Sequence, residues 1–67
     1  MNSYVELTQI NGNTIHVMAN SVMVIKPTSI GSVLSLFGNL EIMVKETSEE
    51  VKNKIEKSTN YIKTKTL

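Results

Sequence analysis

Two stretches near the N-terminus alternate between apolar and polar residues, the pattern of a strand with one buried face. They cover residues 4–10 and residues 14–18. Between them lies the dipeptide Asn11-Gly12, which favours a tight type I′ turn because both residues tolerate positive φ. The pattern therefore predicts a β-hairpin. The side chains expected on its buried face are Val5, Leu7, Ile15 and Val17.

The alternation fails in residues 22–26, where the strand begins with the continuous apolar run Val-Met-Val-Ile. Either both faces of this strand are covered, or one face is an exposed patch used for contact. Pro27 is expected to end the strand because proline cannot donate a hydrogen bond to the ladder. Gly31 is expected to be the flexible point of the loop that follows. The apolar run is the strongest indication of an interface in the sequence.

A second hairpin is predicted from strands at residues 32–36 and 40–45, joined by the turn region Phe37-Gly38-Asn39. An aromatic residue at such a turn is either exposed to a partner or folded over the end of the sheet. The apolar residues expected on one face of the hairpin are Leu34, Leu36, Ile42 and Val44.

A helix is predicted over residues 48–60, followed by a frayed tail at residues 63–67. Its start, Thr47-Ser48-Glu49-Glu50, fits the capping box, in which a glutamate reaches back to the N–H of the capping residue. Val51 and Ile55 form an apolar stripe that can cover the hairpin face.

These elements predict one domain, residues 1–67, that is mainly β with one C-terminal helix. About five antiparallel strands are expected to form a curled sheet or a small barrel, with the helix packed on it. A chain of 67 residues buries only a small core, and it contains no cysteine for disulfides or a cysteine-based zinc site. Homo-oligomerisation is therefore favoured over a monomer.

The charge balance argues against a dedicated nucleic-acid binder. The net charge is +1, all seven basic residues are lysine, and all six acidic residues are glutamate. Nucleic-acid-binding domains usually carry a basic surplus and use arginine for guanine and phosphate. The candidate anion contacts are Lys52, Lys54 and Lys57, although a solvated helix face that complements the helix dipole is the favoured explanation for them.

No catalytic, metal-binding or cofactor-binding pattern stands out, so a non-enzymatic protein without a cofactor is predicted. The single histidine, His16, is expected to face outward with Glu6 as its only plausible companion, which is too few ligands for a metal site. No apolar run approaches the 20 or so residues that span a membrane, and the N-terminus does not resemble a signal peptide. A cytoplasmic location is expected.

Three segments carry a resemblance to a known family. They are Leu-Thr-x-Ile-Asn-Gly at Leu7–Gly12, the apolar strand from Val22, and Val-Lys-Glu-Thr-Ser-Glu-Glu-Val at Val44–Val51. Together they resemble the small FlbD-type flagellar and swarming-motility proteins, which are distinct from the response regulator of that name. The resemblance implies the order hairpin, strand, hairpin, helix and a motility- or phage-associated role. It implies no chemical activity and no catalytic or ligand-binding residue.

The favoured hypothesis is a protein-interaction module that forms a homo-oligomer or docks on a protein partner. Its candidate contact residues are Val22, Met23, Val24, Ile25 and Phe37. One alternative is a nucleic-acid-binding small β-barrel that uses the three lysines of the helix. Another is an oligomeric phage protein that sequesters a small nucleotide between subunits.

Overall fold

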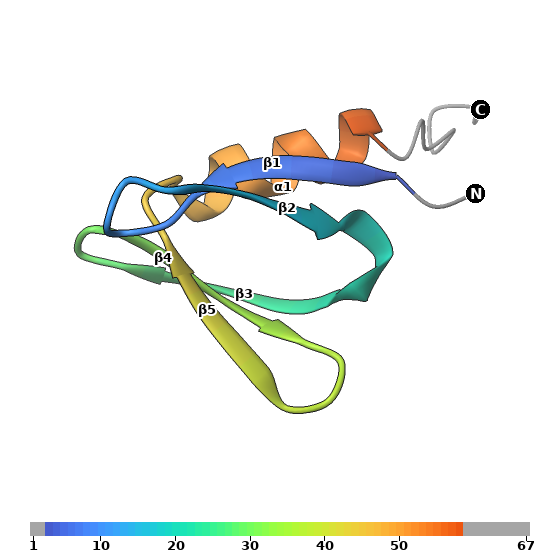
Figure 1. Cartoon of the computed structure of the whole chain (residues 1–67), viewed down its shortest axis with the longest axis horizontal. Helices are drawn as coiled ribbons and strands as arrows, with labels where there is room; N and C mark the ends of the chain where they lie inside the picture. Colours follow the sequence, from blue (N-terminus) through green and yellow to red (C-terminus); the bar gives the residue numbers. More distant parts are fainter. Residues whose placement is uncertain (1–2, 59–67) are drawn as a thin grey trace.

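A computed structural model describes residues 3–58 of the chain. Its elements follow one another in the predicted order of hairpin, strand, hairpin and helix (Figure 1). They are β1 (Tyr4–Thr8), β2 (Thr14–Met18), the 3-10 helix η1 (Ala19–Ser21), β3 (Val22–Thr28), β4 (Gly31–Leu36), β5 (Leu40–Val44) and α1 (Ser48–Ser58). The predicted helix end at residue 60 and the tail at residues 63–67 lie outside the described residues.

The strands form two antiparallel sheets, β1-β2 and β3-β4-β5. The sheets meet at one corner, where Gln9 bridges Val44 and the N–H of Lys45 donates to the carbonyl of Thr8 at 2.8 Å. Beyond this corner the strands do not close into the expected small barrel. Instead α1 packs against β1, β3 and β4. The mainly β class with five antiparallel strands and a C-terminal helix is confirmed, but the sheet is divided.

The core lies between the two sheets and the inner side of α1. Its buried apolar side chains come from both hairpins and the helix, as the apolar alternation predicts, and from Ala19 in η1. They are Val5, Leu7, Val17, Ala19, Leu34, Val44 and Val51. Burying one aliphatic side chain contributes about 1.5–3 kcal/mol. The packing of Val51 against both sheets therefore makes the helix part of the core.

The first turn is not the predicted type I′ turn. The N–H of Gly12 donates to the carbonyl of Gln9, and the N–H of Gln9 donates to the carbonyl of Asn13, both at 2.8 Å. Gly12 has a φ of 96°, whereas Asn11 is not in the positive-φ region. Asn11 acts through its side chain, which accepts the N–H of Asn13 at 3.0 Å. This is the local hydrogen bond that makes asparagine common in turns.

Pro27 does not end β3, contrary to expectation, because the strand continues to Thr28. β3 is an edge strand that pairs only with β4, so a missing donor on its open side costs no ladder hydrogen bond. The turn consists of Ser29 and Ile30 alone, and Gly31 is already the first residue of β4. Gly31 is thus part of the sheet rather than a flexible loop residue.

The predicted capping box forms at the start of α1. The N–H of Glu50 donates to Oγ1 of Thr47 at 3.1 Å, and the N–H of Thr47 donates to Oε1 of Glu50 at 2.9 Å. Two donors at the helix start are thereby satisfied. The cap fixes the direction in which the chain leaves the loop after β5 and turns the stripe of Val51 toward the core.

We expect Thr47→Ala to lower the free energy of unfolding by about 1 kcal/mol, because the N–H of Glu50 loses its acceptor. Thr47→Ser retains the hydroxyl and should stay within about 0.5 kcal/mol of the wild type. Urea unfolding followed by circular dichroism measures both. An equal loss in the two variants would contradict the role of the hydroxyl.

Candidate protein-interaction surface

A β-bulge in β3 explains the continuous apolar run. The pairing with β4 shifts between Val22 and Val24, which leaves Met23 as an extra residue. A bulge interrupts the two-residue alternation of a strand. As a result Met23 and Val24 are both exposed, at 60% and 47%, whereas Val22 and Ile25 pack against the core. The run is therefore divided between core and surface.

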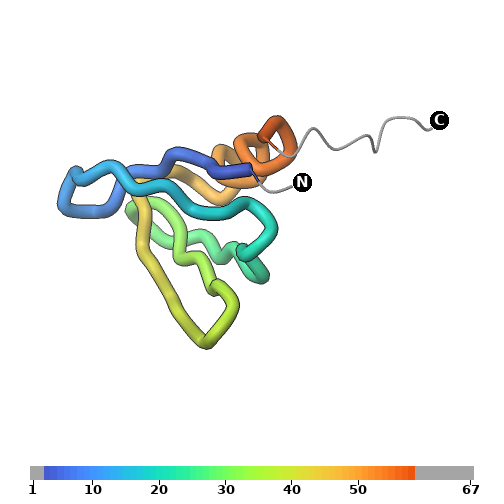
Figure 2. Tube along the Cα trace, turned by 45° about the vertical axis from the view of Figure 1, so that its right-hand side comes forward, coloured from blue at the N-terminus to red at the C-terminus, as the bar shows by residue number. Residues whose placement is uncertain are grey.

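Phe37 lies at the tip of the β4-β5 hairpin, beside the start of β3. Its N–H donates to the carbonyl of Ser21 at 3.2 Å, and its side chain is 65% exposed. Gly38 and Asn39 complete the turn with φ values of 82° and 61°, a region that both residue types tolerate. Figures 1 and 2 show this turn far from α1. Of the two alternatives for Phe37, the exposed one is found.

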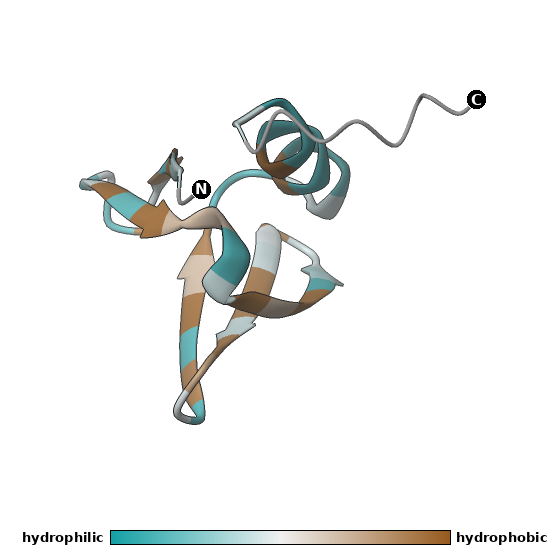
Figure 3. Cartoon of the chain, turned by 90° about the vertical axis from the view of Figure 1, so that its right-hand side faces the viewer, coloured by the Kyte–Doolittle hydropathy of each residue, from teal (hydrophilic) through white to brown (hydrophobic). Residues whose placement is uncertain are grey.

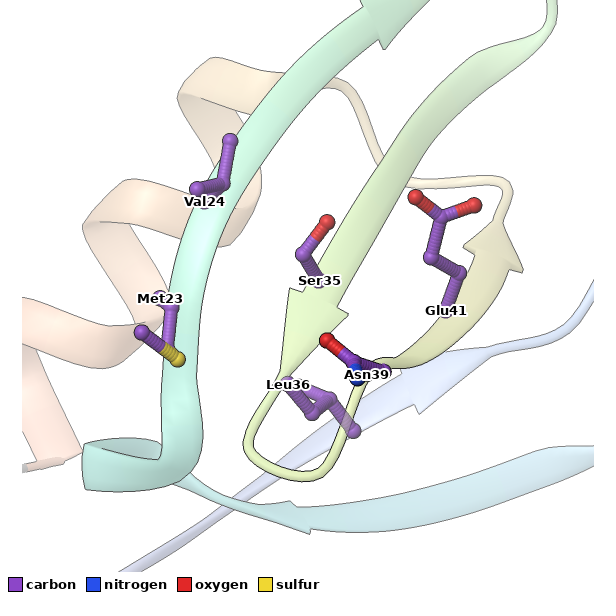
Figure 4. A pocket seen from close by; sticks show the side chains of 6 residues that line it. All are labelled: Met23, Val24, Ser35, Leu36, Asn39 and Glu41. Atoms are coloured by element: carbon purple, nitrogen blue, oxygen red, sulfur yellow. The ribbon is translucent and has the colours of Figure 1, made fainter.

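An open hollow of about 420 Å³ lies between the bulged part of β3 and the β4-β5 hairpin. It is lined by Met23, Val24, Ser35, Leu36, Asn39 and Glu41. Figure 4 shows the side chains of β3 on one side and hydroxyl, carboxamide and carboxylate oxygens of the hairpin on the other. An apolar wall that faces hydrogen-bonding groups is the usual composition of a binding site.

The hollow adjoins the outer face of the three-stranded sheet, the face opposite the core. Leu34 is fully buried, so its neighbours Val33 and Ser35 in β4 point the other way. The strand register then defines the outer face as Val24, Lys26, Val33, Ser35, Glu41 and Met43. Helix α1 lies on the core side, where Val51 packs with Leu34. Figure 3 shows apolar bands along this sheet and a largely hydrophilic helix.

The three lysines proposed as anion contacts are all exposed on α1, but they do not line one site. Lys54 and Lys57 border a hollow of about 270 Å³ between the helix and β1, together with Glu6. Lys52 does not line this hollow. It is two positions before Lys54, and two residues of a helix turn by about 200° around the helix axis. The carboxylate of Glu6 beside Lys54 and Lys57 also opposes the binding of an anion.

His16 lies opposite Glu6 in the first hairpin, as its expected companion. The Nε2 atom of His16 is 3.8 Å from Oε1 of Glu6, and the two side chains are 61% and 67% exposed. Such an exposed pair contributes little to stability. Residues 3–58 contain no cluster of three or more histidine, cysteine or acidic side chains that could hold a metal ion.

Sequence reasoning missed the contacts of Glu46, which join the two sheets. Its carboxylate accepts the N–H of Thr8 at 3.0 and 3.1 Å and the Thr8 hydroxyl at 3.0 Å. The buried hydroxyl of Ser32 donates to the Glu46 carbonyl at 2.8 Å. No local signal in the sequence identifies a partner of Glu46 that lies 38 residues away.

The fold and the exposed surface define a small two-sheet β protein with a C-terminal helix and an uncovered sheet face of apolar and polar side chains. No protein-family model, no curated protein and no solved structure matches the chain. Within residues 3–58, no helix combines the length and apolar character needed to cross a membrane.

Proposed function

We propose that the protein is a non-enzymatic interaction module that associates with a second copy of itself through the outer face, the bulge and Phe37. The observation that carries this proposal is the bulge in β3. It exposes Met23 and Val24 side by side, next to a hollow, on a sheet face that no described element covers. Contiguous apolar surface of this kind marks interaction sites in small proteins.

The exposed side chains supply apolar area that a contact can bury. Four large ones on or beside this surface are about half exposed or more, namely Met23, Val24, Phe37 and Met43. Complete removal of such a side chain from water contributes about 1.5–3 kcal/mol, from which the cost of association is subtracted. A domain with so small a core gains stability from covering them.

A protein partner on the same surface is the second form of this proposal. The resemblance of residues 7–12 and 44–51 to the FlbD-type family supports a motility- or phage-associated setting for the module. Nucleic-acid binding through Lys52, Lys54 and Lys57 and nucleotide sequestration between subunits rank lower. Neither alternative draws support from the positions of these lysines, which do not line one site.

We expect Met23→Glu and Val24→Lys each to raise the dissociation constant of the self-association at least about tenfold, because each buries an unpaired charge in the contact. Sedimentation over a range of protein concentrations measures this change. Ile30→Glu is the matched control, since Ile30 is 59% exposed but lies in the turn between β3 and β4, at the other end of β3. If both test variants keep the wild-type mass distribution, an interface at the bulge is ruled out.

A further inference from the structure

The outer face carries two opposite charges at diagonally opposite corners. Lys26 on β3 pairs with Val33, whereas Glu41 on β5 pairs with Ser35. Two strand spacings and two residues along the strand separate the two positions by roughly 12 Å, too far for an ion pair within one copy. Within residues 3–58, Lys26 and Glu41 form no ion pair with each other.

This arrangement is self-complementary under two-fold symmetry. An isologous contact brings residue i of one copy to residue j of the other, and j to i. The relevant axis lies in the plane of the outer face, perpendicular to the line from Lys26 to Glu41. It places Lys26 of each copy over Glu41 of the other, so two ion pairs flank a centre formed by Val33 and Ser35.

We infer that a second copy of this chain packs face to face on the outer face, with Lys26 of each copy bound in the hollow beside Glu41 of the other. This inference rests on the proposed self-association and names its geometry. The hollow suits a lysine: Glu41 accepts the ammonium group, and Met23 and Val24 form the apolar wall on the opposite side of the hollow. The hydroxyl of Ser35 and the carboxamide of Asn39 add further oxygen atoms to the polar side.

The edges of the sheet are less suited to the contact than its face. The open edge of β3 contains the bulge at Met23 and also Pro27, two features that hinder strand addition. At the end of β5, the outward N–H of Lys45 already donates to Thr8 at 2.8 Å. A partner that pairs along either full edge would have to displace these features, whereas the outer face is open.

The test is a charge exchange. We expect Lys26→Glu and Glu41→Lys each to raise the dissociation constant about tenfold or more, because each variant creates two like-charge contacts per dimer. The double variant restores both pairs and should associate within about threefold of the wild type. An equimolar mixture of the two single variants should form heterodimers in preference to either homodimer, since both ion pairs are then present. Native mass spectrometry and sedimentation at low salt measure these outcomes.

Lys52→Glu is the control, since it makes the same charge change on the exposed surface of α1 and should leave the dissociation constant within about twofold. Circular dichroism confirms that each variant is folded. If the wild type associates but both single variants associate equally well, the face-to-face geometry is wrong and the proposed function stands. If the wild type is monomeric at every concentration, the proposed self-association and this inference both fail.

Discussion

Gly31→Ala is expected to lower the free energy of unfolding by about 3–5 kcal/mol. A Cβ atom at this buried position would overlap the carbonyl oxygen of Val44 and lie 2.9 Å from Cα of Lys45. Both are backbone atoms at the end of β5 and cannot rotate away. The φ of Gly31, 157°, is also one that L residues rarely adopt. A domain of this size has a total stability of roughly 3–10 kcal/mol, so much of the chain should be unfolded.

Gly38→Ala is the matched control for this prediction. Gly38 has a φ of 82°, but a Cβ atom there would meet nothing within 4 Å. Gly38→Ala should therefore lower the free energy of unfolding only by the conformational cost of a left-handed alanine, about 1–2 kcal/mol. The chain has no tryptophan, so circular dichroism during urea unfolding is the appropriate measurement. If Gly31→Ala lowers the free energy of unfolding no more than Gly38→Ala does, the close approach of β4 to the end of β5 is contradicted.

Local patterns predicted the elements because their causes are local. Val5, Leu7 and Val17 alternate with polar residues, and each is buried in its hairpin. The capping box of Thr47 and Glu50 also lies within four residues, so its sequence pattern contains both partners. Such features depend on strand and helix periodicity rather than on which elements meet in space.

The division into two sheets depends on contacts that no local pattern contains. Gln9 meets Val44, and Thr8 meets Glu46, across more than 30 residues. The role of Gly31 has the same origin, because the backbone that excludes its Cβ belongs to the end of β5. Glycine at a predicted loop indicates flexibility from sequence alone, whereas here it permits a close approach.

The candidate surface was predictable only in part. The broken alternation identified residues 22–25 as the candidate interface, but the bulge decides that only Met23 and Val24 are exposed. Lys26 and Glu41 were not among the expected contacts. Their common face follows from the register of three strands, and a shift of one residue would move either side chain to the other face.

Glu46→Ala is expected to lower the free energy of unfolding by about 2–3 kcal/mol at neutral pH. The half-buried N–H and the hydroxyl of Thr8 would lose a charged acceptor, and hydrogen bonds to charged groups contribute about 1.5–3 kcal/mol. The contact also holds β1 against the end of β5. Glu49→Ala is the control, because Glu49 is exposed in the first turn of α1. This variant should lower the free energy of unfolding by only about 0.5 kcal/mol.

The contribution of Glu46 should depend on pH. Desolvation by burial acts to raise its pKa, but hydrogen bonds from Thr8 and from its own N–H, with the charge of Lys54, bring the pKa below its usual value. Because the folded pKa lies below the unfolded one, which is about 4.3, the stabilisation is present above that value and is lost as pH falls through the folded pKa. The difference in urea midpoint between wild type and Glu46→Ala should therefore be constant from pH 7 to about pH 5 and become smaller at lower pH.

Lys54→Gln should move this decrease of the difference to higher pH, because it removes a charge that favours the carboxylate of Glu46. A difference that stays constant down to about pH 2 would show that the ionised carboxylate does not carry the contact.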